Sequence, residues 1–213
     1  MTATTGPGPA RDVRVCALGD SYVAGVGDPQ HLGWVRRLAA RTHAGGLPLT
    51  VYDLGVRRDT LADVARRWLP ECAPRLPAGC EGRVLVSGGV NDTTAADGPV
   101  GVRVRPDDAV RHLRTVVRGA RDHGWDVLVV GPAATDDDAH NARAARLDAA
   151  LGKFCVADGV PYVAVHAALA SDPTWRREVR EGDGAHPSSG GYDVLATLVE
   201  PAWRSWLAPP TAS

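Results

Sequence analysis

The chain has 213 residues, of which 44% are hydrophobic and 23% charged, and its 24 basic and 25 acidic residues give a net charge of −1. This composition is typical of a globular domain with a sizeable core, and the balanced charge argues against a nucleic-acid-binding surface. No apolar run approaches the roughly 20 residues that span a bilayer, and the first residues lack the pattern of a secretory signal, so we expect a cytoplasmic protein.

Short apolar runs alternate with amphipathic segments across residues 12–208, which we expect to form one domain. Residues 1–11 and 209–213 are rich in Pro, Gly and Thr and are expected to be disordered tails. Five runs rich in Val or Leu are bounded by Gly, Pro or Asp and predict strands at 13–18, 49–54, 83–87, 126–130 and 161–165. Near-continuous apolar strands are typical of a parallel sheet that is covered on both faces.

The segments between these runs repeat apolar residues every three or four positions, which predicts amphipathic helices. The apolar faces are Leu61, Val64 and Trp68; Val110, Leu113, Val117 and Ala120; Leu147, Leu151 and Phe154; and Tyr192, Leu195, Val199, Trp203 and Trp206. A strand followed by a helix, repeated about five times, predicts an α/β fold with a doubly wound, five-stranded parallel sheet. Residues 93–105 are expected to form a loop beside a site.

The four cysteines suggest no metal site. Cys16 and Cys155 lie in apolar runs and are expected to be small core residues. Cys72 and Cys80 lie in a Pro-rich segment and could pair, but free thiols are the expectation for a cytosolic chain. Because no Cys-x-x-Cys spacing occurs, we predict no zinc site, and no cofactor is expected.

The residues that follow each strand are the candidates for chemistry, because sheets of this kind bind ligands outside the carboxyl ends of their strands. The first strand is followed by G-D-S-Y (19–22), the second by L-G-V-R-R-D-T (54–60), the third by G-G-V-N-D (88–92) and the fourth by G-P-A-A-T (131–135). The letters D-G-A-H-P (183–187) stand before the last helix.

Ser21, His186 and Asp183 together predict a nucleophilic serine. A serine hydroxyl needs an imidazole that takes its proton, and the imidazole needs a carboxylate that holds its tautomer. His186 lies in a turn before a helix with Asp183 three residues earlier, so Asp183 can face ring atom Nδ1 while Nε2 points away. We also expect Ser21 to begin a helix.

Acyl transfer further requires donors for the developing oxyanion. The Ser21 N–H is one candidate, and Gly55 lets backbone approach a ligand closely and offers a second N–H. Asn91 offers a side-chain amide. Each of these residues could instead be only part of a turn. However, the candidates follow successive strands, one at the end of each strand, in the order that a shared site requires.

These motifs resemble the four sequence blocks of the SGNH hydrolases, also called GDSL esterases/lipases. The resemblance extends from Arg14 to about Trp206. It implies a flavodoxin-like, three-layer α/β/α sandwich and serine ester hydrolysis without a metal. It also implies that Ser21 is the nucleophile, His186 the base and Asp183 the orienting acid.

By the same resemblance, the oxyanion hole consists of the N–H groups of Ser21 and Gly55 and the side chain of Asn91, and Asp20 supports the nucleophile turn from behind. The chain departs from the family pattern at Asp53, where Asn is frequent, and at 57 and 58, where smaller residues are frequent. The elbow G-x-S-x-G of the α/β-hydrolases does not occur.

Arg57 and Arg58 allow two interpretations. Two guanidiniums at a substrate entrance favour an acidic or phosphorylated substrate. Alternatively, they belong to a solvated helix start, with Arg58 paired to a nearby acid.

The function predicted from these residues is a serine-dependent carboxylic-ester hydrolase that acts on a small-molecule ester through an acyl-enzyme. Few long apolar residues lie near the site segments, so short-chain acyl esters are expected. An alternative is an acyltransferase or deacetylase on a sugar or small metabolite that uses the same residues. A flavodoxin-like module that binds a phosphate is a remote alternative, because phosphate-binding fingerprints do not occur. The sequence does not indicate the oligomeric state.

Overall fold

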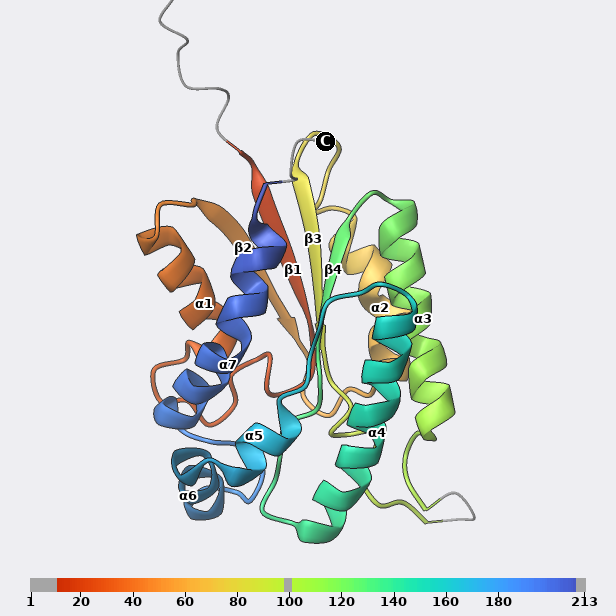
Figure 1. The fold of residues 1–213 in the computed structure, drawn as a ribbon, viewed down its shortest axis with the longest axis vertical. Coiled ribbons are helices and arrows are strands. Elements are labelled where there is room, and N and C mark those ends of the chain that lie inside the picture. Colours follow the sequence, from red (N-terminus) through yellow and green to blue (C-terminus); the bar gives the residue numbers. More distant parts are fainter. Residues whose placement is uncertain (1–10, 98–100, 210–213) are drawn as a thin grey trace, which may run out of the picture.

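The computed structural model describes residues 11–97 and 101–209, and Figure 1 shows its ribbon. Five parallel strands form one sheet in the order β2-β1-β3-β4-β5. Their bounds are β1 (Val13–Gly19), β2 (Leu49–Gly55), β3 (Glu81–Ser87), β4 (Asp126–Val130) and β5 (Tyr162–Val163). The predicted doubly wound parallel sheet is therefore confirmed.

The part of the chain that the structure describes contains seven helices. They are α1 (Gly33–Ala44), α2 (Leu61–Cys72), α3 (Pro106–Asp122), α4 (Asp138–Ala157), α5 (His166–Ser171), α6 (Pro173–Glu181) and α7 (Ser189–Leu207). None of these helices is long and apolar enough to cross a membrane.

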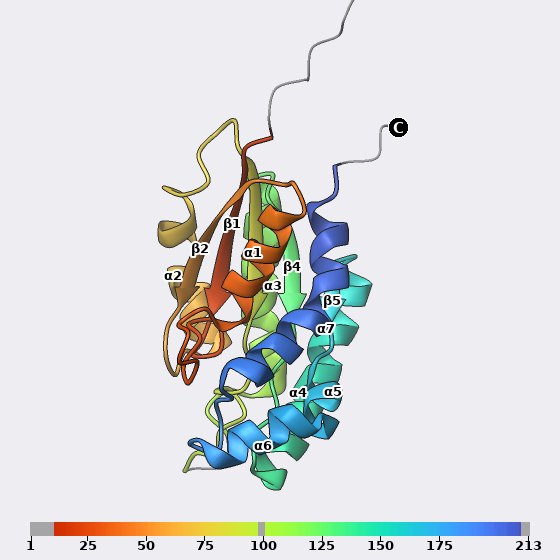
Figure 2. The same ribbon diagram turned by 90° about the vertical axis from the view of Figure 1, so that its left-hand side faces the viewer.

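The helices cover both faces of the sheet, because successive side chains along a strand point to opposite faces. Val15 and Ala17 of β1 belong to the core beneath α1, α5, α6 and α7, whereas Cys16 and Leu18 belong to the core beneath α2, α3 and α4. Figure 1 shows the first group of helices to the left of the sheet and the second to the right, and in Figure 2 α1 and α7 lie in front of the strands. This arrangement is the expected three-layer α/β/α sandwich.

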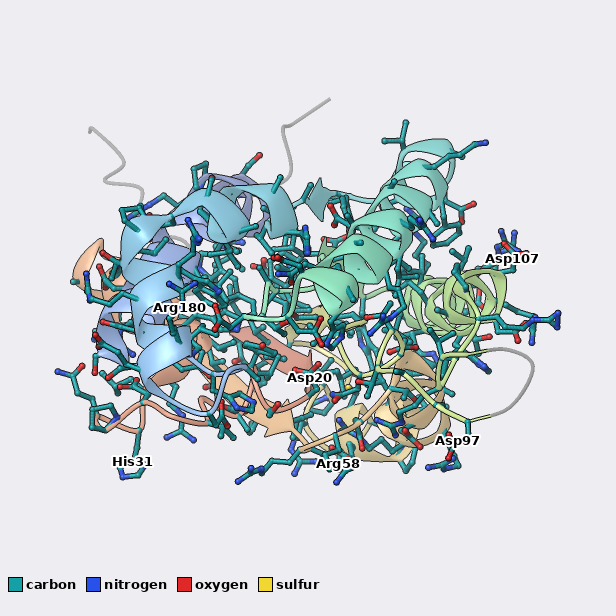
Figure 3. The ribbon with its side chains drawn as sticks, turned by 90° about the horizontal axis from the view of Figure 1, so that it is seen from below. Asp20, His31, Arg58, Asp97, Asp107 and Arg180 are labelled. Carbon is teal, nitrogen blue, oxygen red and sulfur yellow. The ribbon has the colours of Figure 1, made fainter. Side chains whose placement is uncertain are left out.

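The carboxyl end of β1 lies at the point where the strand order reverses, since β1 pairs with β2 on one side and with β3 on the other. Gly19, the last residue of β1, is in register with Gly55 and Ser87 at the ends of those neighbours. Loops after all three strands therefore meet at one edge of the sheet, where open α/β sheets bind ligands. Figure 3 looks onto this edge, with Asp20 near its centre.

The last strand is shorter than the sequence predicts. We expected a strand over 161–165, but β5 has only two residues. Pro161 has no N–H to donate, although its carbonyl accepts a hydrogen bond from the Val129 N–H at 3.0 Å. Because the chain turns into α5 at His166, the pairing ends after Val163.

Three further expectations concern loops, tails and thiols. Residues 93–97 and 101–105 lie in loops joined by an isolated bridge between Ala95 and Val102, and positions 98–100 of the expected loop 93–105 lie outside the described residues. The expected tails, 1–11 and 209–213, also lie outside them except for their innermost residues. Of these, Arg11 binds the Glu81 carboxylate at 2.8 and 2.6 Å and so belongs to the fold.

All four cysteines are described, and all are free thiols.

Candidate active site

Ser21 lies in a series of turns after β1, and the expectation that it begins a helix is wrong. Residues 21–27 form turns, and the first helix begins only at Gly33. Gly25 and Gly27 have φ angles of 70° and 89°, in the left-handed region that glycine tolerates and that ends a right-handed helix. The tight turn still projects Ser21 from the end of β1.

Ser21, His186 and Asp183 form a continuous chain of contacts. The Nε2 atom of His186 lies 2.7 Å from Ser21 Oγ, and its Nδ1 atom lies 2.7 Å from Asp183 Oδ2. Ser21 is buried, and the His186 side chain is only 12% exposed. The structure therefore brings these three predicted residues together, although Ser21 and His186 are 165 positions apart.

The Asp183 carboxylate fixes both the turn and the imidazole. Its Oδ1 atom accepts hydrogen bonds from the N–H groups of Ala185 at 3.0 Å and of His186 at 2.8 Å, which leaves Oδ2 for the ring. Desolvation opposes ionisation, but these hydrogen bonds outweigh it and lower the pKa of Asp183 to about 2. An ionised carboxylate can only accept, so Nδ1 carries the ring proton and Nε2 is free to accept the Ser21 proton.

Tyr22 supports the imidazole, a role that the sequence did not indicate. Its hydroxyl donates a hydrogen bond to the Ala185 carbonyl at 2.7 Å, and its ring centroid lies 5.1 Å from that of His186. The other side of Tyr22 stacks on Trp175 with the centroids 6.1 Å apart. The residue after the nucleophile thus holds the loop that carries His186.

A buried carboxylate at Asp28 joins the nucleophile loop to the same segment. Asp28 is fully buried and forms an ion pair with Arg37, which is 8% exposed. It also accepts hydrogen bonds from Ser189 Oγ at 2.7 Å and from the Gly33 N–H at 2.9 Å. Because Ser189 follows His186 by three residues, Asp28 connects α1, α7 and the histidine loop.

Replacing Asp28 by asparagine is expected to destabilise the protein by about 3 kcal/mol, because the buried Arg37 then keeps only its longer ion pair, with Asp193 at 3.8 Å. Urea unfolding followed by tryptophan fluorescence measures this change. The matched control is Asp108→Asn, which breaks an exposed pair with Arg111 and should leave the midpoint unchanged. Equal midpoints for Asp28→Asn and the wild type would show that the buried pair does not stabilise the fold.

Asn91 lies beside Ser21, as expected from the sequence. Both residues line one open cavity at the carboxyl edge of the sheet. The Asn91 side-chain amide donates to the Asp59 carbonyl at 3.0 Å and lies 3.4 Å from Asp20 Oδ2. These contacts fix the orientation of the amide next to the nucleophile.

Gly55 is near the nucleophile turn but does not line this cavity. Its N–H donates to Asp53 Oδ1 at 3.2 Å. A Cβ atom at Gly55 would lie 2.3 Å from the Ala24 nitrogen, so the absence of a side chain lets the end of β2 pack against the turn. The position of Gly55 therefore has a steric explanation, and its role as an oxyanion donor stays a prediction.

The Arg58 N–H is a second backbone donor at the cavity, which the sequence did not indicate. Arg58 lines the cavity with Ser21 and adopts a φ angle of 70°, unusual for a residue other than glycine. Within residues 11–97 and 101–209, the N–H groups of Ser21 and Arg58 donate no hydrogen bond. Such N–H groups can bind an oxygen that gains negative charge.

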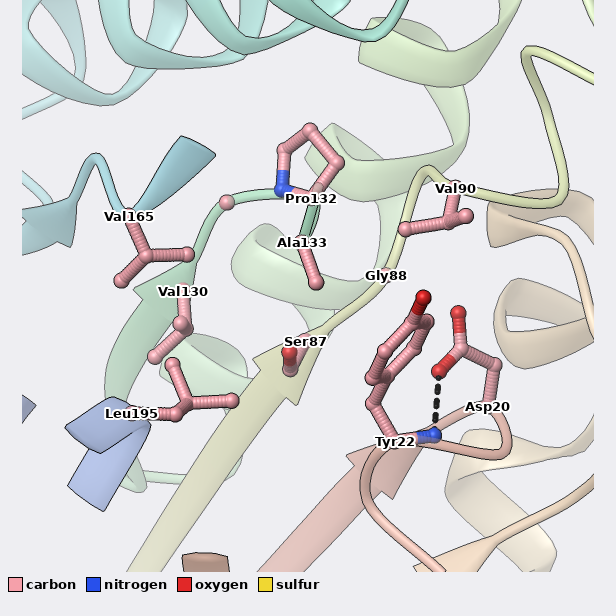
Figure 4. A pocket seen from close by; sticks show the side chains of 11 residues that line it. Asp20, Tyr22, Ser87, Gly88, Val90, Val130, Pro132, Ala133, Val165 and Leu195 are labelled. Atoms are coloured by element: carbon pink, nitrogen blue, oxygen red, sulfur yellow. Dashed lines mark hydrogen bonds between the residues drawn. The ribbon is translucent and has the colours of Figure 1, made fainter. Parts of the chain in front are cut away.

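Asp20 lies behind the nucleophile in a nearly closed environment. Figure 4 shows its carboxylate beside Tyr22 at a cavity of about 10 Å³, the size of a single water molecule. Desolvation, with a smaller contribution from the nearby carboxylates of Asp92 and Asp59, raises the pKa of Asp20 to about 7 against the hydrogen bond that it accepts from the Tyr22 N–H. A carboxyl group beside the nucleophile is thus expected to titrate near neutrality.

This raised pKa makes the free energy of unfolding depend on pH. An unfolded aspartate loses its proton near pH 3.9, whereas folded Asp20 keeps it up to about pH 7. The free energy of unfolding is therefore highest below pH 4, where Asp20 is protonated in both states. It falls as the pH rises from 4 to 7, by up to about 1.4 kcal/mol per pH unit. Asp20→Asn should remove this slope.

Urea unfolding of Asp20→Asn and of the wild type at pH 5, 6, 7 and 8 measures the effect. The variant should gain stability relative to the wild type as the pH rises. Asp108→Asn serves as the control, because its exposed carboxylate, whose pKa the Arg111 hydrogen bond lowers, is ionised throughout this range. Parallel curves for Asp20→Asn and the wild type would contradict a raised pKa.

The cavity above Ser21 has a volume of about 230 Å³ and is lined mostly by polar and charged residues, which present both polar and apolar atoms to it. Thr94, Thr135, Asp137 and His140 contribute to its wall. The Nε2 atom of His140 lies 2.9 Å from the Val90 carbonyl, so this nitrogen of the second histidine already has a hydrogen-bond partner.

Arg57 and Arg58 also line this cavity. The interpretation that Arg58 pairs with a nearby acid does not hold, because the adjacent Asp59 binds Arg67 at 2.6 Å. In the described part of the chain, neither Arg57 nor Arg58 forms an ion pair.

Comparisons with known proteins show the family and the fold. The sequence matches the model of the GDSL-like lipase/acylhydrolase family over residues 17–194. Among solved structures, a lipase/acylhydrolase from Enterococcus faecalis has a TM-score of 0.74 and 22% identity, and the match covers 94% of this chain and 100% of that one. The acetylxylan esterase Axe2 from Geobacillus stearothermophilus has a TM-score of 0.72 and 17% identity, with 96% and 98% covered.

A third solved structure, TesA, has a TM-score of 0.74 and 21% identity, with 91% of this chain and 99% of that one covered. At such identities the structural likeness establishes a shared fold. No curated protein matches the sequence.

Proposed function

The chain belongs to the GDSL-like lipase/acylhydrolase family, and on that premise we propose that it cleaves carboxylic esters through an acyl-enzyme on Ser21. Family membership makes the protein an ester hydrolase in general terms and argues against a module that only binds phosphate. The observation that carries the mechanism is the chain of contacts from Asp183 through His186 to Ser21, with 2.7 Å at both steps.

The reaction follows from the direction of these contacts. Ser21 Oγ attacks the carbonyl carbon while His186 Nε2 takes the hydroxyl proton, and Asp183 stabilises the imidazolium that forms. The tetrahedral intermediate then expels the alcohol, which receives the proton from His186. Water attacks the acyl-enzyme with His186 again acting as base, and the acid leaves as Ser21 regains its proton.

The oxyanion would be bound by the Ser21 N–H, the Arg58 N–H and the Asn91 side chain, whose NH₂ group would exchange its long 3.4 Å contact with Asp20 Oδ2 for the oxyanion. The first two N–H groups donate no other hydrogen bond among the described residues, and all three residues line the cavity. The Arg58 N–H is better placed for this role than the Gly55 N–H, which is engaged with Asp53.

Short acyl groups fit this cavity best. Its volume of about 230 Å³ is small for a long acyl chain, and charged side chains such as those of Arg57, Arg58 and Asp137 border it. Polar groups that a long acyl chain buries without a partner cost free energy, which disfavours lipase-like substrates. The preference for short-chain esters is therefore a consequence of the lining.

A panel of p-nitrophenyl esters from acetate through butyrate and octanoate to palmitate tests this proposal. We expect kcat/KM to be highest for acetate or butyrate and to fall for the longer esters. Adding primary alcohols or sugars to the same reactions tests the alternative acyl transfer, since an acceptor would appear as a new ester in the products. A maximum at palmitate would contradict the short-chain preference, and a lack of hydrolysis of every ester would contradict the function.

A further inference from the structure

The charge around the candidate site is unevenly distributed. Arg57 and Arg58 are both exposed and line the cavity above Ser21. A second cavity of about 310 Å³ on another side of His186 is lined by Glu178 and Glu181. A substrate in contact with His186 therefore meets cationic side chains in one direction and carboxylates in the other.

The acids that share the cavity with Arg57 and Arg58 already have other partners. Asp183 binds the His186 ring at 2.7 Å, and Asp137 accepts a hydrogen bond from the His140 N–H at 2.9 Å at the start of α4. Some exposed arginines elsewhere pair with a nearby acid, as Arg180 does with Asp136 at 3.0 Å. Arg57 and Arg58 thus form no ion pair among the described residues, and the carboxylates of Asp137 and Asp183 in the same cavity are held by other groups.

The backbone at Arg58 gives a second, independent observation. Its φ angle of 70° lies in the left-handed region, where a residue with a Cβ is strained and glycine is not. The Arg103 guanidinium holds this turn by donating to the Arg58 carbonyl at 2.9 Å. Strained residues of this kind concentrate at functional sites. A long cationic side chain at a position that suits glycine indicates that the cation itself has a role.

We propose that Arg57 and Arg58 bind a carboxylate carried by the ester substrate, so that the preferred substrate is an anionic short-chain ester. This proposal rests on the function proposed above. Guanidiniums recognise carboxylates through paired hydrogen bonds, and their long stems can place the charged groups over a substrate that occupies the cavity. Glu178 and Glu181 repel the same carboxylate from the other side of His186, which fixes the orientation of the substrate.

Two matched pairs of esters test this substrate class and distinguish where the carboxylate sits. The p-nitrophenyl hemisuccinate is compared with p-nitrophenyl butyrate for a charge on the acyl side, and 4-acetoxybenzoate with phenyl acetate for a charge on the alcohol side. For each variant, the measured quantity is the ratio of kcat/KM for the anionic ester to that for its neutral partner.

The double variant Arg57→Gln/Arg58→Gln should lower this ratio about tenfold in one of the two pairs. The double lysine variant, which keeps the charge, should retain most of the ratio. The control Arg118→Gln removes an exposed charge on α3, away from the site, and should change nothing. The wild-type ratio should also fall as NaCl is added, because salt screens exposed charges.

A ratio that is insensitive to salt and to the glutamine double variant in both pairs would overturn the assignment of an anionic substrate. In that case hydrolysis of the neutral esters would leave the proposed function intact. If none of the four esters were hydrolysed, the proposed function itself would fail, so the two failures are distinguishable.

Discussion

Replacing Ser21 by alanine is expected to lower kcat for a short-chain ester by about 10⁴–10⁶-fold. The variant loses the oxygen that would carry the acyl group, and His186 loses the hydroxyl whose proton it would accept at 2.7 Å. His186→Ala should cost about as much, since the serine then has no base.

The double variant should be little worse than either single variant, because residues that act as one unit give strongly non-additive losses. Steady-state kinetics with p-nitrophenyl acetate measures these effects, and circular dichroism with urea unfolding controls for folding. Ser21 lies in a turn rather than inside a helix, so the loss of one hydroxyl should leave the unfolding midpoint nearly unchanged. Substantial turnover in a folded Ser21→Ala protein would exclude Ser21 as the nucleophile.

Asp183→Asn is expected to lower kcat by about 10²–10⁴-fold through the tautomer of His186. An asparagine can keep its oxygen on the N–H groups of Ala185 and His186, the partners that Asp183 Oδ1 has now. Its NH₂ group would then face Nδ1 and donate to it. The ring would carry its proton on Nε2, where it cannot accept the proton of Ser21.

Two further measurements make this prediction specific. Asp137→Asn changes another carboxylate of the same cavity, one that starts α4 and does not touch His186, and asparagine serves equally well at that position. Its kcat should therefore remain near that of the wild type. In addition, the ring proton of His186 should shift from Nδ1 to Nε2 in nitrogen-resolved NMR of Asp183→Asn. An unchanged kcat in Asp183→Asn would show that this carboxylate does not orient the base.

Much of the fold could be predicted from the sequence, because its strands are short, apolar and clearly bounded. The first four predicted strands match β1 to β4 closely. By contrast, α1 was not indicated by an apolar face, since its stretch G-W-V-R-R-L-A-A-R-T-H-A is rich in arginine and the residue before it, Leu32, has no side chain that can cap a helix. The ion pair between Arg37 and Asp28 holds this helix in a way that no local pattern reveals.

The identity of the candidate site residues could be predicted because each follows a strand or precedes a helix at one edge of the sheet. The conformation of the turns could not. The helix expected at Ser21 is replaced by turns because Gly25 and Gly27 take left-handed conformations. Likewise, Gly55 was expected to supply a backbone donor because glycine lets the backbone approach a ligand closely. In the structure it is Arg58 that has a positive φ angle and lines the cavity.

The interactions that the sequence did not predict are contacts between segments far apart in the chain. The sequence indicates no role for Tyr22, yet its hydroxyl donates a hydrogen bond to the Ala185 carbonyl, 163 positions away. Ser189 similarly reaches Asp28 across 161 positions. Such bonds depend on how α7 packs against α1, which local propensity does not determine.

The formation of an acyl-enzyme on Ser21 is tested most directly by reacting the protein with a fluorophosphonate and measuring its mass before and after digestion. We expect one adduct per chain, located on the peptide that contains Ser21, with loss of esterase activity in proportion to labelling. We expect no adduct in Ser21→Ala. A protein that still hydrolyses esters after complete labelling, or that carries its adduct on another residue, would exclude an acyl-enzyme on Ser21.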